Sequence, residues 1–375
     1  MPSCLLLSTL LGSALFAGLG EVAVGRLLVE GGHRALILGP AGAYLLEGEA
    51  NSALYGLARR PGGYLAVGHL GERLLRVTLD AEGRPLAALV GGQGILWGTD
   101  GRFAWGGHLG PQGWQALVLE GTRAHRLPLP AEGYAYGGLY RAGVLFLVGR
   151  VASPGGFDAF FLGLKDGYAQ GYQSGFPGND YLRFLGERGA VGRLEVEGDS
   201  EGLVLDWPGL LRGKARLLRR PGFDYLRAWQ GAYLVGEAEV AGVLQGLWLG
   251  PKGARHGGGP GAFLRALDPP WAYGYSYRAL FQGEGLFLDR EGRRRAPLKG
   301  EVSREEAEAL FRRAVRLSRF PLPQELLKEE PPPAWRKSGL LRGLRPLEVG
   351  RVFRSGERAF QVELDPELGV VYLPV

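Results

Sequence analysis

The chain has 375 residues, of which 46% are hydrophobic, 22% are charged and 65 are glycines, and its net charge is +6. This balance excludes intrinsic disorder, and because the glycines follow no Gly-X-Y period it also excludes a collagen-like chain. The one cysteine, Cys4, excludes an internal disulfide and a cysteine-based zinc cluster, and we interpret it as an incidental thiol. Asparagine occurs only at Asn51 and Asn179, and a scarcity of thermolabile residues is typical of a thermophile.

The N-terminal 20 residues carry no charge and have two interpretations. The run Leu5–Phe16 resembles the apolar core of a secretion signal or anchor, although no basic residue precedes it. Alternatively, Thr9–Gly25 aligns without a gap on Ser52–Gly68, which predicts the first strands of a repeat. Both interpretations stay open at this point. We expect a cell-envelope or secreted location over a cytoplasmic one, with membrane association only through this segment.

Short segments that end in glycine recur along the chain and define a register. We call these the landmark glycines: Gly25, Gly68, Gly106, Gly149, Gly192, Gly236, Gly274 and Gly350. Their successive spacings are 43, 38, 43, 43, 44, 38 and 76 residues. A period of about 40 to 45 residues is that of propeller blades.

Each repeat is predicted to hold four short strands. In the second repeat, Ser52–Arg59 leads through a Pro-Gly-Gly turn to Tyr64–Gly68. An alternating run at Leu74–Leu79 then ends in the hairpin turn Asp80–Gly83, and a fourth run follows. Such units closed into a ring hide their sheet edges. We therefore predict an all-β fold, a β-propeller of eight, alternatively seven, four-stranded blades.

The pattern GGYLxxG followed by LDxxG, at Gly62–Gly68 and Leu79–Gly83, resembles that of bacterial β-propeller repeat proteins. The resemblance covers residues 5–297 and 336–375. It implies the architecture and is silent on function, because propellers host enzymes, lectins and scaffolds alike.

Residues 300–335 break the strand pattern. Ser303–Glu306 form a capping box, and the apolar residues that follow, up to Leu317, fall on one helical face. We predict a helix that ends before Phe320, followed by a stiff linker at Glu329–Pro333. The expected organisation is therefore blades one to seven at 1–299, the helical insertion with its proline-rich linker at 300–335, and a C-terminal blade that closes the ring at 336–375.

The sequence contains none of the familiar catalytic motifs, and we assign no catalytic residue. His69 and His108 follow landmark glycines, but we interpret them as surface residues and expect no metal and no cofactor. Asp180 and Asp224 occupy equivalent positions in adjacent repeats. Paired carboxylates would suit acid–base work on a sugar, whereas the favoured interpretation is that each caps a blade turn.

Arginines recur at a nearly fixed distance before the landmark glycines. The ninth position before a landmark holds Arg59, Arg183, Arg227, Arg265 or Trp97, and the eighth holds Arg141 or Arg342. Because equivalent positions in a ring have equivalent environments, we predict that these residues share one mouth of the central channel. A ring of guanidinium groups there would attract carboxylate, sulfate or phosphate groups. The alternative is that each arginine pairs with a neighbouring carboxylate.

Three functions remain open from the sequence. The leading hypothesis is a non-catalytic propeller scaffold that binds a protein partner or a glycan through one face. The second is a binder of polyanions, either nucleic acid or acidic polysaccharide, at the arginine-lined mouth. The third is a carbohydrate-active hydrolase or lyase.

Overall fold

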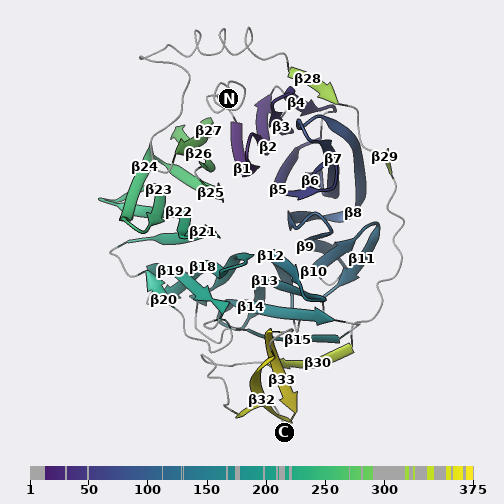
Figure 1. The fold of residues 1–375 in the computed structure, drawn as a ribbon, viewed down its shortest axis with the longest axis vertical. Helices are drawn as coiled ribbons and strands as arrows, with labels where there is room; N and C mark the ends of the chain where they lie inside the picture. The colour runs from purple at the N-terminus through teal and green to yellow at the C-terminus, as the bar shows by residue number, and fades with distance from the viewer. Residues whose placement is uncertain are drawn as a thin grey trace. The chain divides into compact units, whose positions relative to one another are not determined.

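A computed structural model describes most of the chain from residue 13 to residue 289, and the side chains described lie within residues 13–276. Beyond residue 289 the described segments are 317–320, 324–325, 336–341, 352–355, 358–365 and 369–374. Gaps before residue 289 fall at 30–31, 49, 112, 128, 130, 166–167, 174–177, 197–198, 208–209, 211–215, 219–221, 270 and 280–281. Strands make up nearly all of the regular structure (Figure 1).

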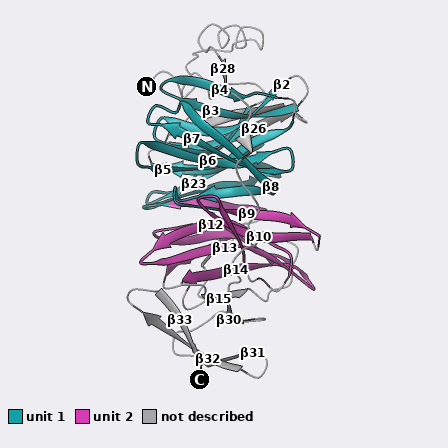
Figure 2. Cartoon of the chain, turned by 90° about the vertical axis from the view of Figure 1, so that its right-hand side faces the viewer, with its two compact units in different colours: residues 1–104, 230–328 teal, residues 105–229, 329–375 magenta. Residues whose placement is uncertain are grey.

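The chain divides into two compact units, which Figure 2 colours separately. Unit 1 comprises residues 1–104 and 230–328, and unit 2 comprises residues 105–229 and 329–375. Within each unit, strands that follow one another in the sequence pair antiparallel, so each repeat is a meander of neighbouring strands.

The sheets of unit 1 follow the chain order. Its strands are β1 (Ser13–Leu19), β2 (Val22–Val29), β3 (Gly32–Gly39), β4 (Gly42–Leu46), β5 (Ser52–Arg60), β6 (Gly63–Leu70), β7 (Arg73–Asp80), β8 (Pro85–Thr99), β22 (Tyr233–Val240), β23 (Val243–Gly250), β24 (Gly253–Pro260), β25 (Ala262–Asp268), β26 (Trp271–Ala279), β27 (Gln282–Asp289), β28 (Leu317–Phe320) and β29 (Gln324–Glu325). Strands β1–β4, β5–β8, β22–β24 and β25–β27 form successive antiparallel runs, and β28 and β29 add in parallel to β4 and β8.

Unit 2 has the same local organisation. Its strands are β9 (Phe103–Gly110), whose first two residues belong to unit 1, β10 (Gly113–Glu120), β11 (Arg123–Arg126), β12 (Gly133–Arg141), β13 (Val144–Ser153), β14 (Gly156–Lys165), β15 (Tyr168–Gln173), β16 (Gly178–Asn179), β17 (Tyr181–Gly186), β18 (Gly189–Val196), β19 (Asp199–Asp206), β20 (Arg216–Leu218), β21 (Asp224–Gln230), β30 (Arg336–Leu341), β31 (Val352–Ser355), β32 (Arg358–Asp365) and β33 (Gly369–Pro374). Strands β9–β11, β12–β15, β17–β20 and β31–β33 form antiparallel runs, and β30 pairs in parallel with β15.

Alternating apolar residues explain why these segments form strands with buried faces. In β7, Leu75, Val77 and Leu79 are buried while Arg76 and Thr78 between them are only partly covered. Side chains of a strand point alternately to opposite faces, so one face of β7 packs on its neighbours. In unit 1 this face joins a core that includes residues of β2, β3, β5 and β6. In unit 2 a corresponding core joins β13, β14 and β17–β19.

The landmark glycines mark a close approach between the first two strands of a repeat. A Cβ atom would lie 1.8 or 1.9 Å from a carbonyl oxygen of the facing strand at Gly25, Gly68, Gly149, Gly192 and Gly274. No side chain fits at that distance, since real Cβ atoms essentially never approach another heavy atom within 3.0 Å. The repeated glycine is therefore a requirement of the backbone, which explains why it sets the register of the repeat.

A β-bulge accompanies each of these glycines. Gly192, for example, pairs with Leu182, and the next pair joins Val191 to Phe184, so Arg183 is skipped. We call the skipped residues the bulge residues: Phe16, Tyr55, Tyr136, Arg183 and Arg265. A bulge leaves one residue out of the ladder and redirects its side chain. Every bulge residue in these five strands is aromatic or arginine.

The first repeat lies beside the repeat at residues 262–289 within unit 1. Asp268 accepts a hydrogen bond from the backbone N–H of Gly20 (2.5 Å), and the Tyr273 hydroxyl donates to the Gly20 carbonyl oxygen (2.6 Å). Tyr273 is fully buried in the core shared with β1–β4. The prediction that the C-terminal segment 336–375 forms the blade that closes the ring stays a prediction.

The strand interpretation of the N-terminal region is confirmed for the described residues, because β1 and β2 lie in the first sheet. Residues 1–12 lie outside the described part of the chain. The predicted helix from Ser303 to before Phe320 also falls largely outside it, but its last residues, 317–319, lie in β28 and are not helical. The predicted linker at 329–333 lies wholly outside the described residues. No helix among the described residues is both long and apolar enough to span a membrane.

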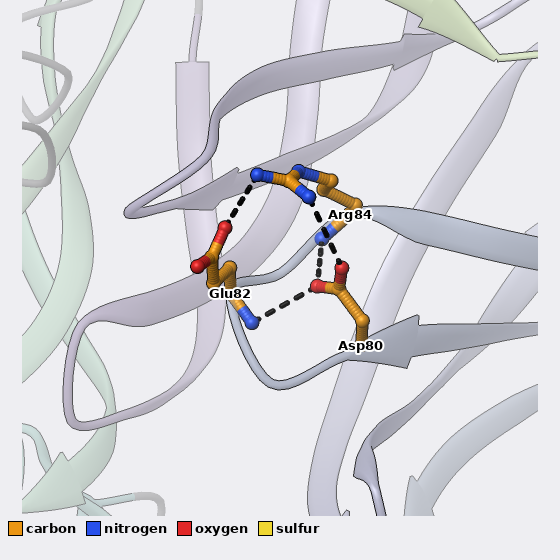
Figure 3. A network of polar contacts seen from close by, with 3 residues as sticks. All are labelled: Asp80, Glu82 and Arg84. Atoms are coloured by element: carbon orange, nitrogen blue, oxygen red, sulfur yellow. Dashed lines mark hydrogen bonds and ion pairs between the residues drawn. The ribbon is translucent and has the colours of Figure 1, made fainter.

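The predicted hairpin turn after β7 is confirmed, and Asp80 holds it together (Figure 3). Its Oδ1 atom accepts hydrogen bonds from the backbone N–H groups of Glu82 (2.9 Å) and Arg84 (2.8 Å). Gly83 adopts a φ of +84°, a conformation that favours glycine. Arg84 also pairs with Glu82 (2.5 Å) and, more distantly, with Asp80 (3.9 Å).

We expect Asp80→Ala to lower the free energy of unfolding by about 1 to 2 kcal/mol, because two backbone donors lose a charged acceptor. Arg84→Ala is the matched control and should have little effect, since exposed ion pairs contribute little to stability. Urea unfolding of both variants measures the difference. Equal losses for the two variants would mean that the ion pairs, and not the side-chain cap, hold the turn.

Candidate functional site

The structure places the predicted arginines at two different kinds of position. Arg183 and Arg265 are bulge residues. Arg59 and Arg141 instead lie near the ends of hairpins, opposite Tyr64 and Val144, and both are exposed. The prediction that residues at the same distance before a landmark glycine occupy equivalent places in the fold is therefore wrong for Arg59 and Arg141.

Hairpin length explains the discrepancy. After the bulge, β1, β17 and β25 continue for three paired residues, whereas β5 and β12 continue for five. Two extra residues on each side of the hairpin move the bulge from the ninth to the thirteenth position before the landmark glycine. The true equivalents of Arg183 and Arg265 are therefore Tyr55 and Tyr136.

The remaining predicted residues divide between the units. Trp97 lies in unit 1, where its ring centroid is 4.6 Å from that of Tyr55. Arg227 lies in unit 2, with its guanidinium carbon 3.4 Å from the ring centroid of Tyr225. Arg342 falls outside the described residues.

Unit 2 gathers arginines and aromatic rings into one cluster. We call it the unit 2 arginine cluster, and it comprises Arg150, Arg183, Arg193 and Arg227 with Tyr134, Tyr136, Phe157, Tyr181, Phe223 and Tyr225. The guanidinium carbon of Arg150 lies within 6 Å of four ring centroids, the nearest being that of Phe157 at 4.2 Å. Arg193 lies over the ring of Tyr181 at 4.6 Å, and Arg183 lies over that of Tyr136 at 4.5 Å.

Sequence reasoning missed the two central arginines of this cluster. Arg150 and Arg193 each directly follow a landmark glycine, as Arg26 does in the first repeat. The recurring Gly-Arg pair was therefore a usable signal. It places the side chain on the second strand, beside the bulge that the glycine permits.

Neither Arg150 nor Arg193 forms an ion pair with a carboxylate among the described residues. The Nε atom of each is buried and has no hydrogen-bond partner within the described part of the chain. Arg193 does donate through Nη2 to the Tyr181 hydroxyl, at the long distance of 3.5 Å. The two guanidinium groups are therefore held mainly by the faces of aromatic rings, an interaction worth about 0.5 to 2 kcal/mol each.

Burial dominates the electrostatics at the centre of the cluster. It raises the pKa of Tyr136 to about 12, although the nearby charges of Arg183 and Arg150 act to lower it. Burial likewise raises the pKa of Tyr134 against the charge of Arg150. Both tyrosines are therefore neutral at neutral pH and do not cancel the charge of the arginines.

Unit 1 contains a different cluster, in which rings outnumber arginines. Ring contacts run without a break from Phe263 to Tyr275 (5.1 Å between centroids), Phe16 (5.8 Å), Tyr55 (4.9 Å) and Trp97 (4.6 Å). We call these five residues, with the attached His69, Arg26 and Arg265, the unit 1 ring cluster. Arg26 lies over the ring of Phe16 at 5.6 Å, and Arg265 hydrogen-bonds to the Tyr275 hydroxyl.

His69 extends the unit 1 ring cluster by stacking on Tyr55 at 5.6 Å between ring centroids. Its Nδ1 atom lies 2.8 Å from the Gly71 carbonyl oxygen, which can only accept, so Nδ1 carries the proton. In the neutral ring Nε2 then accepts from the Tyr55 hydroxyl at 3.3 Å. Burial, with the charge of Arg26 in support, lowers the pKa of His69 despite the bond to Gly71.

This lowered pKa predicts a loss of stability in mild acid. The unfolded chain binds a proton at His69 near pH 6.5, whereas the folded chain resists it, so the free energy of unfolding should fall as the pH drops below about 6.5. His69→Gln should reduce the pH dependence of the urea midpoint between pH 7.5 and 5.5. An unchanged pH dependence in that variant would contradict the assignment.

The two candidate carboxylates are not placed for work on a substrate. Asp180 is fully buried, and its Oδ1 atom accepts a hydrogen bond from the backbone N–H of Glu195 (3.1 Å). Asp224 is 1% exposed. The hydrogen bond from Glu195 supports a structural role for Asp180, but this donor lies within β18 and not in a blade turn. No group of three or more potential metal ligands occurs among the described residues.

Comparisons with known proteins match the chain to propellers and, near the C-terminus, to one family. It is similar to the β-propeller domain of the Trilobed protease from Pyrococcus furiosus, at 10% identity and a TM-score of 0.45, over 77% of this chain and 98% of that domain. It is also similar to the Pyrococcus horikoshii acylaminoacyl peptidase, at 12% identity and a TM-score of 0.47, over 77% of this chain and 52% of that protein. Residues 279–370 match the family model of the Cas3 C-terminal domain.

These comparisons correct the leading functional hypothesis. A non-catalytic scaffold that binds a protein partner or glycan does not agree with the match of residues 279–370 to the Cas3 C-terminal domain. The fold expectation is confirmed in its main statement, since the described strands form repeated antiparallel meanders of neighbouring strands. The number of blades stays a prediction. The chain is an all-β protein of the β-propeller class.

Proposed function

We propose that the chain binds nucleic acid through the phosphate backbone, and that the unit 2 arginine cluster holds the phosphates. One observation carries this proposal: Arg150 and Arg193 lie against several aromatic rings and have no carboxylate partner among the described residues. A positive charge with no counter-ion in the described part of the chain is available to an external anion. The chain as a whole also carries a net charge of +6.

The geometry of a stacked guanidinium suits this role. The aromatic ring covers the flat face of the group, while the five N–H donors lie in its plane and point past the ring. A phosphate has two free oxygens that match a pair of these donors. The rings around Arg150 also fix its orientation in advance, so less side-chain entropy is lost when the phosphate binds.

The match of residues 279–370 to the Cas3 C-terminal domain gives separate support for a nucleic-acid-related role. That match and the arginine cluster lie on different parts of the chain, so they support the proposal independently. The whole matched segment lies outside the residues whose side chains are described, and we assign no contact to it.

Fluorescence anisotropy with a labelled oligonucleotide and the full chain tests the proposal. We expect saturable binding whose affinity falls linearly with salt concentration on logarithmic axes, because each neutralised phosphate releases counter-ions. Absence of binding at low salt would refute the proposal. Binding that does not respond to salt would exclude the arginine cluster as its cause.

A further inference from the structure

The unit 1 ring cluster has the chemistry of a stacking platform. Phe16 and Tyr55 are bulge residues of neighbouring first strands, and Trp97 lies next along the same series of rings. All three residues are half-buried, so each keeps part of its surface accessible. A flat ring that is partly exposed offers its face to another planar group.

Glycines hold these rings close to one another. A Cβ on Gly56 would lie 2.6 Å from the Cα of Gly98, so the backbones directly after Tyr55 and Trp97 touch. At Gly18 a Cβ would lie 2.4 Å from the ring of Tyr273, which fixes β1 against β26. The ring cluster is therefore built on packed strands, which position side chains more firmly than loops do.

Positive groups lie along this series of rings. Arg26 lies over Phe16 in the middle of the series, and Arg265 lies beside Tyr275 and Phe263 at one end. The Nε atom of Arg265 is buried and has no hydrogen-bond partner among the described residues. The cluster therefore combines ring faces with positive charge, which is what an unpaired nucleobase and its attached phosphate need.

We propose that the unit 1 ring cluster is a second binding site, where unpaired bases of a nucleic acid stack on Tyr55 and Trp97 while Arg26 and Arg265 face the backbone. This inference rests on the proposed function, and it adds a preference for single strands over duplexes. A duplex hides the faces of its bases in its own stack, so it can use the arginines of unit 2 and not the rings of unit 1. Stacking of one base on an aromatic side chain is worth about 1 to 3 kcal/mol.

Two probes with the same length and the same number of phosphates separate the two sites: a labelled oligothymidylate and its fully abasic counterpart. We expect the full chain to bind the oligothymidylate about tenfold more tightly, or better, because only this probe can stack. Tyr55→Leu with Trp97→Leu should abolish the difference and leave the affinity for the abasic probe unchanged. Tyr55→Phe with Trp97→Phe keeps the rings and should keep most of the preference.

Equal affinity of the wild-type chain for both probes would overturn this inference and leave the proposed function intact. A preference that survives in the leucine variant would also overturn it, because stacking would then occur elsewhere. Failure to bind either probe would refute the proposed function and this inference with it. The comparison of probes on the wild-type chain needs no variant, so the inference can be tested even if the leucine variant does not fold.

Discussion

Gly192→Ala is expected to lower the free energy of unfolding by about 3 kcal/mol or more, at the upper end of single substitutions. The added Cβ would lie 1.8 Å from the carbonyl oxygen of Tyr181 and 2.9 Å from the Cα of Leu182. Both are backbone atoms, so the clash can be relieved only by separating β17 from β18 or by losing the bulge at Arg183. Urea unfolding followed by circular dichroism measures the loss.

Gly163→Ala is the matched control in the same unit. A Cβ there would meet only the side chains of Phe146 and Val144, at 3.5 Å, which is ordinary van der Waals contact. Alanine also leaves the unfolded chain fewer backbone conformations than glycine does. The free energy of unfolding of this variant should therefore be unchanged or slightly higher. If the two variants lost the same stability, the landmark glycines would not be a backbone requirement.

The double variant Arg150→Gln with Arg193→Gln is expected to weaken binding of an oligonucleotide at low salt by about 30-fold. The estimate takes about 1 kcal/mol for each charge-assisted contact that is lost. The variant should still fold, at reduced stability, because cation–π contacts at half-buried sites are individually modest. Anisotropy gives the affinity, and circular dichroism confirms the fold.

Two further variants sharpen this test. Arg126→Gln with Arg141→Gln removes the same charge from exposed positions of unit 2 and should change the affinity only slightly. Arg150→Lys with Arg193→Lys keeps the charge but loses the planar donor pair, so it should restore binding in part. If the exposed variant, Arg126→Gln with Arg141→Gln, lost as much affinity as Arg150→Gln with Arg193→Gln, binding would depend on the net charge and not on the unit 2 arginine cluster.

Much of the fold was predictable from the sequence because it depends on backbone requirements that recur. The landmark glycines are needed wherever a bulge brings a carbonyl oxygen against the facing strand, so their spacing reports the repeat directly. The Asp80 turn was predictable for a similar reason, since its aspartate and glycine are set by local geometry. Local chemistry of this kind leaves a pattern in the sequence.

The site was less predictable because hairpin length varies between repeats. Counting back from a landmark glycine found Arg183 and Arg265 but selected Arg59 and Arg141 in place of Tyr55 and Tyr136. Counting forward would have been more reliable, because no turn separates Gly149 from Arg150. The rings that Arg150, Arg183 and Arg193 contact come from other strands of unit 2, and a count along one strand does not identify them.

The salt dependence of binding tests the central claim most directly. For a single strand, the slope of log affinity against log salt is about −0.7 for each phosphate that is neutralised. We expect Arg150→Gln with Arg193→Gln to reduce the magnitude of this slope by about 1.4, and Arg126→Gln with Arg141→Gln to leave it unchanged. An equal slope in the wild-type chain and the clustered variant would contradict the claim that Arg150 and Arg193 hold phosphates.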